Sequence, residues 1–283
     1  MAKLRKISWL LAFICILSGL AESRSLQDDI KISLKETRIK DFSMSGLSYV
    51  FYVNIANSSS SAYYLTAYDY RFLVNQQEYF RLQRSLDKRI EIEPRKSKLL
   101  SFPIKITFAH LFRLVEGIEG EGNLEGNWTG TMSFSDAKRD RGSLLFDFSG
   151  EFPVIKKLEF KFLSLQLKDL TIGGADTRFE ASLVNPNIFD VLIEKISYKF
   201  YLRDSLILEE TVSGGKTIVS RGEQSYSFPM LINFFEVGKD VYTMLQMNSS
   251  LCRFTGEIEV RTEWGRVKIP FDQTGRVTIA RTS

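Results

Sequence analysis

Hydrophobic and polar residues alternate with a period of two along much of the chain, and residues 179–202 show this most clearly. Ile196, Tyr198 and Phe200 alternate there with mostly polar residues, which places the apolar side chains on one face of a strand. Asn185-Pro186-Asn187 interrupts the alternation, and asparagine and proline favour turns. The stretch therefore predicts two strands joined by a turn.

A diverged copy of the same pattern lies upstream, in residues 57–72. An offset of 128 (185 − 57) aligns Asn57 with Asn185, and an offset of 126 (228 − 102) aligns Phe102 with Phe228. The change in offset corresponds to a length difference of two residues between these points. The chain is therefore predicted to be a tandem repeat of two units of about 120 residues, each large enough to bury its own core.

Each copy carries one helix-like segment. Residues 110–115 form a short one in the first copy, and residues 237–247 form its counterpart in the second, where Val237, Val241 and Met244 lie near helical spacing. A helix of this length is marginal in water by itself, so we expect it to pack on the sheet or across an end of the unit. Short alternating strands with one brief helix predict a β-sandwich of about seven strands in each unit. The expected boundaries are 22–155 and 156–283.

Segments rich in charge, serine or glycine are predicted as connections. Residues 35–40 read as a charged link, residues 75–98 as a variable charged stretch with one short strand, and residues 138–141 as the solvated tip of a hairpin. Residues 214–217 have the sequence Gly-Gly-Lys-Thr, which imitates the end of a phosphate-binding loop. Glu210 stands where that motif requires glycine, so we expect an ordinary glycine turn.

The first 21 residues are expected to be a signal peptide. Lys3, Arg5 and Lys6 form a positive region, an apolar region follows, and Ala21 ends a small-residue cleavage site. The alternative is an uncleaved membrane anchor, but residues 7–21 are fewer than the roughly 20 that span a bilayer. Lipid attachment at Cys15 is disfavoured because large residues precede it. The mature protein is therefore expected to be exported, either periplasmic or secreted.

The charge of the chain changes once this segment is removed. The formal net charge is +4 for the full sequence, and removal of three positive residues leaves +1. A near-neutral chain without a basic stripe is poorly suited to nucleic acid, which requires many clustered phosphate contacts. We therefore expect no nucleic-acid partner.

Residue types that carry catalysis or hold metals are scarce. The sequence has one histidine, His110, which we expect to be partly buried and satisfied, and Cys252 alternates onto the apolar face of a strand. These residues form no catalytic triad and no multi-histidine metal site. The acidic, glycine-rich residues 117–126 are expected to form a solvated loop, with a weak calcium site as the alternative. We expect no cofactor and no enzymatic activity.

The second copy resembles a known family. Asn185-Pro186-Asn187, the strand ending in Tyr-Lys-Phe-Tyr-Leu, the strand containing Phe228-Pro229 and the late Lys-Ile-Pro-Phe-Asp sequence together resemble the late embryogenesis abundant type 2 family, also called the water-stress-and-hypersensitive-response (WHy) domain. The resemblance covers nearly all of residues 160–280, and the first copy lacks the Asn-Pro-Asn and Ile-Pro-Phe sequences. It implies an all-β fold of two tandem fibronectin-III-like sandwich domains, and an association with desiccation and stress protection.

Two roles follow as hypotheses. The first is a non-enzymatic protective or binding protein, in which a groove beside the second helix, lined by Phe234, Phe235, Val241 and Met244, binds lipid or another apolar ligand, with peripheral membrane contact. The alternative for these four residues is that they complete the core. Asn185, Pro186 and Asn187 are expected to be structural: Asn185 bonds its own turn, Pro186 fixes φ and Asn187 tolerates a positive φ. The second role is a structural or assembly module of the cell envelope that binds an envelope protein.

Overall fold

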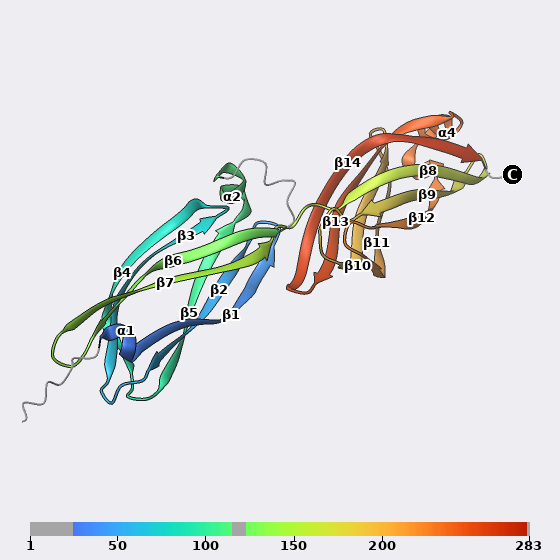
Figure 1. The fold of residues 1–283 in the computed structure, drawn as a ribbon. Coiled ribbons are helices and arrows are strands. Elements are labelled where there is room, and N and C mark those ends of the chain that lie inside the picture. Colours follow the sequence, from blue (N-terminus) through green and yellow to red (C-terminus); the bar gives the residue numbers. More distant parts are fainter. Residues whose placement is uncertain (1–24, 115–122, 282–283) are drawn as a thin grey trace, which may run out of the picture.

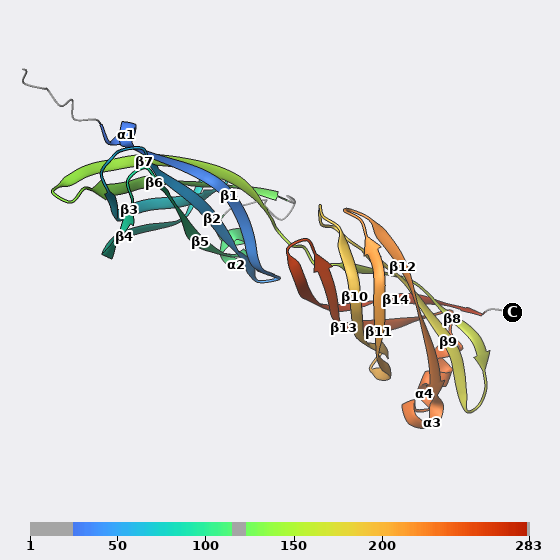
Figure 2. The same ribbon diagram turned by 90° about the horizontal axis from the view of Figure 1, so that it is seen from below.

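The computed structural model describes residues 25–114 and 123–281. These residues form fourteen strands and four short helices, so the predicted all-β class is confirmed. The strands are arranged in two elongated bodies that lie end to end (Figure 1), and a view at right angles shows the same arrangement (Figure 2). The predicted signal peptide and most of the glycine-rich segment lie outside the described residues.

The first unit consists of two sheets. One has the strand order β1-β2-β5 and the other has the order β4-β3-β6-β7. Helix α1 (Leu26–Asp29) precedes them, and helix α2 (Phe108–Leu114) follows β5. The strands are β1 (Ile30–Ser43), β2 (Gly46–Asn57), β3 (Tyr63–Val74), β4 (Gln77–Ile92), β5 (Ser97–Thr107), β6 (Asn123–Ser135) and β7 (Asp140–Pro153).

The second unit repeats this neighbour order in one continuous sheet, β11-β10-β13-β14-β8-β9-β12. The sheet is continuous because the end of β14 pairs in parallel with β8, from Thr278 opposite Ser164 to Arg281 opposite Leu167. Helices α3 (Phe234–Val237) and α4 (Lys239–Leu245) follow β12. The strands are β8 (Glu159–Leu170), β9 (Gly174–Val184), β10 (Val191–Leu202), β11 (Ser205–Ile218), β12 (Glu223–Asn233), β13 (Ser249–Thr262) and β14 (Gly265–Arg281).

The two-residue difference in offset between the halves lies in one pair of strands. β4 starts at Gln77 and β11 at Ser205, an offset of 128 (205 − 77), whereas they end at Ile92 and Ile218, an offset of 126 (218 − 92). β11 is the shorter strand, with 14 residues against 16 in β4. The length difference is therefore absorbed inside an edge strand and not in a turn.

One large aromatic side chain lies at the centre of each core. Trp128 of β6 is fully buried, and its ring centroid lies 4.9 Å from both Phe51 and Phe102. Phe254 holds the equivalent place in β13, 5.2 Å from Phe228 and 5.3 Å from Phe179. Such aromatic side chains bury large apolar areas and dominate core energetics.

Several predicted connections are strands in the structure. Residues 35–40 were expected to be a charged link but belong to β1, which pairs with β2 across a register shift between Leu34 and Glu36. Most of residues 75–98 form β4, an edge strand with polar residues on both faces, which removes the alternation that predicts a strand. The Gly-Gly-Lys-Thr segment is part of β11 and not a turn.

The helix predictions hold with shifted boundaries. The predicted helix at residues 110–115 is α2. The predicted helix at residues 237–247 is interrupted at Gly238, whose φ of 91° separates α3 from α4. Glycine adopts this left-handed conformation without a Cβ penalty. Of the predicted hairpin tip at residues 138–141, Lys138 and Arg139 lie in the turn between β6 and β7, and residues 140–141 begin β7. The Asp136 carboxylate accepts hydrogen bonds from the Lys138 and Arg139 N–H groups.

Candidate functional site

Asn185 follows β9 and is fully buried. Its Nδ2 group donates to the carbonyl oxygens of Phe189 at 2.8 Å, Ile218 at 3.2 Å and Val219 at 3.1 Å. Its Oδ1 atom accepts from the Asn187 N–H at 3.0 Å. The side chain thus ties the β9–β10 loop to the end of β11, and this use of every polar atom is what a buried amide requires.

Asn187 does something other than what its sequence position predicted. Its φ is not positive, so the expected left-handed turn conformation is wrong. Its Oδ1 atom accepts from the Lys156 N–H at 2.7 Å and its Nδ2 group donates to the Lys156 carbonyl at 3.1 Å. Asn187 therefore holds the backbone of the segment that joins the two units.

The first unit reproduces the Asn185 arrangement with a different neighbour. Asn57 donates to the carbonyl oxygens of Ser61, Ile92 and Glu93. Ser59 replaces Asn187, and both its N–H and its hydroxyl donate to Asn57 Oδ1, at 3.0 and 2.7 Å. The turn is therefore kept without proline. Asn57 is only 2% exposed, so its side chain is not accessible in the folded protein.

An aromatic contact joins the two units. Phe42, at the end of β1, packs with its ring centroid 5.1 Å from Trp264 and 6.1 Å from Phe189, which both belong to the second unit. Val154 and Ile155 of the connecting segment are also buried. The segment at residues 153–157 is too short for a free linker, which predicts that the units touch. Sequence reasoning did not identify Phe42, Phe189 and Trp264 as the contact, although a tryptophan in the β13–β14 turn was a usable signal because turns are normally polar.

The four predicted groove residues do not share one surface. Val241 is fully buried and Phe234 is 7% exposed, so both belong to the core. Met244 is half-buried, whereas Phe235 is 87% exposed. α3 begins at Phe234 and is capped by Asn233, whose Oδ1 atom accepts from the Phe235 N–H. Adjacent side chains on a helix point in different directions, so Phe234 faces the core and Phe235 faces solvent.

Phe235 lies beside a second exposed apolar residue that sequence reasoning missed. The Phe234 N–H donates to the Gly173 carbonyl, and a Cβ atom at Gly173 would lie 3.6 Å from the Phe235 ring. Ile172, which precedes Gly173 in the β8–β9 turn, is 91% exposed. Ile172 and Phe235 thus flank Gly173. The β8–β9 turn and α3, which carry them, lie at the end of the second unit that faces away from the first (Figure 2). We call this pair the apolar tip.

The equivalent end of the first unit is built differently. At the offsets of 128 and 126, Met44 and Ala109 stand where Ile172 and Phe235 stand in the second unit. The β1–β2 turn and α2, which carry these two residues, lie at the end of the first unit that faces the second unit (Figure 1). Met44 is partly buried and Ala109 is exposed, so the first unit has no pair of large exposed apolar residues at this position.

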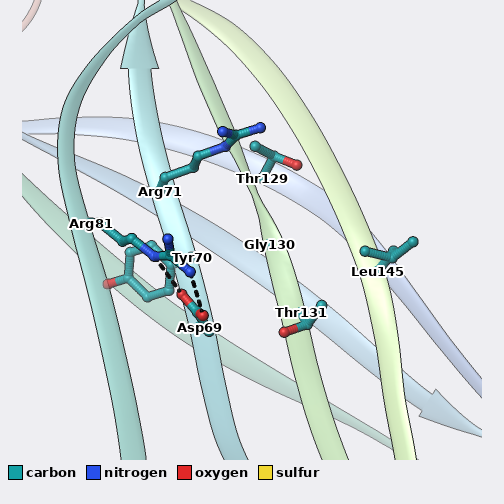
Figure 3. Close-up of a pocket in the computed structure, with 8 residues that line it drawn as sticks. All are labelled: Asp69, Tyr70, Arg71, Arg81, Thr129, Gly130, Thr131 and Leu145. Atoms are coloured by element: carbon teal, nitrogen blue, oxygen red, sulfur yellow. Dashed lines mark hydrogen bonds and ion pairs between the residues drawn. The ribbon is translucent and has the colours of Figure 1, made fainter.

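A shallow depression lies on the outer face of β4-β3-β6-β7 in the first unit and of the equivalent strands β11-β10-β13-β14 in the second. In the first unit Asp69, Arg71, Arg81, Thr129 and Thr131 surround Gly130 (Figure 3). A Cβ atom at Gly130 would lie 2.2 Å from the Asp69 carbonyl oxygen, so the close approach of β3 and β6 requires glycine there. The second unit has the same depression around Gly256, bordered by Lys199, Glu209, Glu210 and Glu257.

The charged residues of the first depression already form an ion pair. Arg81 donates to both carboxylate oxygens of Asp69, at 3.1 and 2.8 Å (Figure 3). This hydrogen bonding lowers the pKa of Asp69 and raises the pKa of Arg81. The carboxylate therefore stays ionised and is a poor general base.

Cys252 and His110, the two residues considered for catalysis, lie in different units and do not form a catalytic pair. Cys252 is free and fully buried, as predicted, and burial raises the pKa of its thiol to about 12. His110 is exposed, which corrects the expectation of a partly buried imidazole, and its ring lies 4.7 Å from the ring of Tyr79. Neither residue borders the other.

Metal-binding clusters and membrane-spanning helices are absent from the described residues. Among residues 25–114 and 123–281, no group of three or more histidine, cysteine, aspartate or glutamate side chains is placed to hold a metal ion. In the same residues no helix has the length and apolar character needed to cross a membrane.

The comparison with protein families gives one match. Residues 180–275 match the family described as late embryogenesis abundant protein, LEA type 2. The matched region contains Asn185-Pro186-Asn187, α3 and α4. The match supports a stress-related protein of the late embryogenesis abundant type at the level of the family. No curated protein matches this chain.

Solved structures give distant similarities only. A protein from Archaeoglobus fulgidus is 14% identical with a TM-score of 0.32, covering 44% of this chain and 94% of its own. Red sea bream transglutaminase is 9% identical with a TM-score of 0.28, covering 90% of this chain and 32% of its own. Bacteroides uniformis beta-glucuronidase is 9% identical with a TM-score of 0.23, covering 81% of this chain and 26% of its own. At these TM-scores no activity is transferred to this chain.

Proposed function

We propose that this protein is a non-enzymatic, exported protein of the late embryogenesis abundant type that binds lipid or other apolar surfaces through the apolar tip. The observation that carries the proposal is the exposure of Ile172 and Phe235, 91% and 87%, on either side of Gly173. The family match over residues 180–275 includes Phe235 and supports a role in stress protection.

The tip supplies enough apolar area for weak, reversible binding. Complete burial of a large apolar side chain is worth about 1.5–3 kcal/mol, so two such residues give roughly 3–6 kcal/mol before the cost of association. A single protein molecule held this weakly would dissociate quickly from a lipid or protein surface. Such binding suits a protein that protects these surfaces only during drying. The groove originally expected beside the helix is replaced in this proposal by a convex contact, because Phe234 and Val241 belong to the core.

The test compares the wild-type protein with Ile172→Ser/Phe235→Ser. Co-flotation with phosphatidylcholine vesicles and recovery of an enzyme dried in the presence of the protein are measured for both. Leu145→Ser is the matched control, because Leu145 is 83% exposed but lies on β7 of the first unit. Loss of vesicle binding in the tip variant alone supports a lipid surface, and loss of enzyme recovery alone supports an apolar protein surface. Equal behaviour of all three proteins in both assays refutes the proposal.

The second candidate role, a structural module of the cell envelope, is favoured by one observation. Phe42 is held between Phe189 and Trp264, and Asn187 holds Lys156, so the connection between the units is packed and hydrogen-bonded. A fixed connection between the units suits a structural spacer, because it keeps the two far ends of the molecule at a constant distance from each other. Capture of one defined envelope protein by the wild-type chain, in the absence of vesicle binding, would favour this role.

A further inference from the structure

β4 and β11 are edge strands at equivalent positions of the two units, and neither contains proline. β4 is the outer strand of the first four-stranded sheet, and β11 is the outer strand at one end of the second sheet. β5, at one edge of the three-stranded sheet, and β12, at the other edge of the second sheet, contain Pro103 and Pro229. The remaining two edges, β1 and β7, contact each other. Proline cannot donate to a ladder, so it blocks the addition of a further strand. β4 and β11 lack this block.

The charges on these two edges are opposite. Between Arg81 and Arg89, β4 carries Arg81, Arg84, Lys88 and Arg89 against the single acidic residue Asp87. Between Ser205 and Gly215, β11 carries Glu209 and Glu210 and no basic residue. Arg81 and Glu209 occupy the same position at the offset of 128 (209 − 81), and each borders the depression of its own unit.

The opposite charges occur on both faces of the strands. Arg84 pairs with Tyr68 across the β3–β4 ladder, and Glu210 pairs with Tyr198 across the β10–β11 ladder, so these two charges lie on the core-facing side of their strands. Arg81 and Glu209 are an odd number of residues away and lie on the outer side. Both faces of β4 therefore carry a cation and both faces of β11 carry a carboxylate, and Arg81 and Glu209 do so at the same position.

Part of this charge has no partner within the described residues. Arg81 is paired with Asp69, and Glu209 lies 3.0 Å from Lys199. Arg84, Lys88 and Glu210 form no ion pair among residues 25–114 and 123–281. All three are exposed. Leu82 and Leu206, 37% and 43% exposed, add apolar area to the two edges.

We propose that β4 of one molecule binds β11 of a second copy of the same chain, by strand addition between oppositely charged edges. Pairing of β4 with β4 or of β11 with β11 would place like charges opposite each other, which is unfavourable. The two edges lie in separate units, so each molecule offers one basic and one acidic edge. The contact is heterologous and extends into chains of molecules.

The test uses the full chain and two charge-reversal variants, Arg84→Glu/Lys88→Glu and Glu209→Lys/Glu210→Lys. Sedimentation velocity is measured over a concentration series at 50 and 500 mM NaCl. The wild-type protein is expected to self-associate at low salt and to weaken by about tenfold or more at high salt, because exposed charges are screened. Each variant alone is expected to be monomeric, and an equimolar mixture is expected to associate again because each basic edge then meets an acidic one.

Lys31→Glu/Lys35→Glu on β1 is the matched control for Arg84→Glu/Lys88→Glu, because it lowers the net charge by the same amount on a different strand. It should associate like the wild type, and circular dichroism establishes that every variant is folded. A wild-type protein that stays monomeric at all concentrations overturns the proposal. Association that persists in both reversal variants, or a mixture that stays monomeric, overturns it as well.

Discussion

Replacement of Asn185 by alanine should destabilise the second unit severely. The substitution removes the donor to three carbonyl oxygens, those of Phe189, Ile218 and Val219, and the acceptor of the Asn187 N–H. Asn185 is fully buried, and an unsatisfied buried polar group costs about 1–3 kcal/mol. Water that enters the vacated space relieves part of the cost. We expect a loss of about 3–5 kcal/mol in the free energy of unfolding.

Urea denaturation followed by circular dichroism measures this loss. A slope of about 2 kcal/mol per molar converts it to a midpoint lower by roughly 2 M for the second unit. Asn248→Ala is the control, because Asn248 is exposed and precedes β13 in the same unit, and it should change stability by less than about 0.5 kcal/mol. Asn57→Ala should produce a loss of similar size in the first unit, because Asn57 makes the same three kinds of contact. A loss below about 1 kcal/mol for Asn185→Ala would refute this reasoning.

Three further results are expected. Phe42→Ser should loosen the junction between the units without unfolding either of them, because it removes the ring that contacts Trp264 and Phe189. Small-angle scattering would detect this as a broader distribution of interatomic distances. An unchanged distribution would show that the Phe42 contact does not hold the two units together. Gly256→Val should destabilise the second unit by about 2 kcal/mol or more in thermal unfolding, because a Cβ atom would lie 2.0 Å from the Ser197 carbonyl oxygen. A neutral result would mean that β10 and β13 can move apart at no cost in free energy. In a Cys15→Ser background, Cys252 should not react with a thiol reagent at pH 8, and rapid labelling of the folded protein would contradict the burial. The stability of the wild-type chain should also fall above about pH 9 relative to Cys252→Ala. The reason is that the folded thiol, with its pKa raised to about 12, stays protonated while the unfolded thiol ionises.

Local alternation predicted most of the strands because half-buried strands carry it. The strand containing Ile196, Tyr198 and Phe200 was predicted in the right place, since these residues face the core and their neighbours face solvent. β4 escaped prediction because an edge strand exposes both of its faces. β4 is a strand because it pairs with β3, and this pairing cannot be read from the local sequence.

The site was predicted less well, for a related reason. Helical spacing grouped Phe234, Phe235, Val241 and Met244, but the break at Gly238 and the cap at Asn233 direct two of them into the core and one outward. Asn187 was expected to turn the chain and instead binds Lys156, 31 residues away in the sequence. Contacts between distant segments decided both outcomes.

The most direct test of the central claim is to place a fluorophore at the apolar tip. In Phe235→Trp, the tryptophan emission is compared with that of the wild-type protein after addition of vesicles that contain brominated lipids, which quench only tryptophans in contact with acyl chains. We predict that the extra emission of the variant shifts to shorter wavelength and is quenched by these lipids. Emission that keeps its aqueous wavelength and is unchanged by brominated lipids, together with enzyme recovery on drying that is the same for wild type and Ile172→Ser/Phe235→Ser, would contradict binding through the tip.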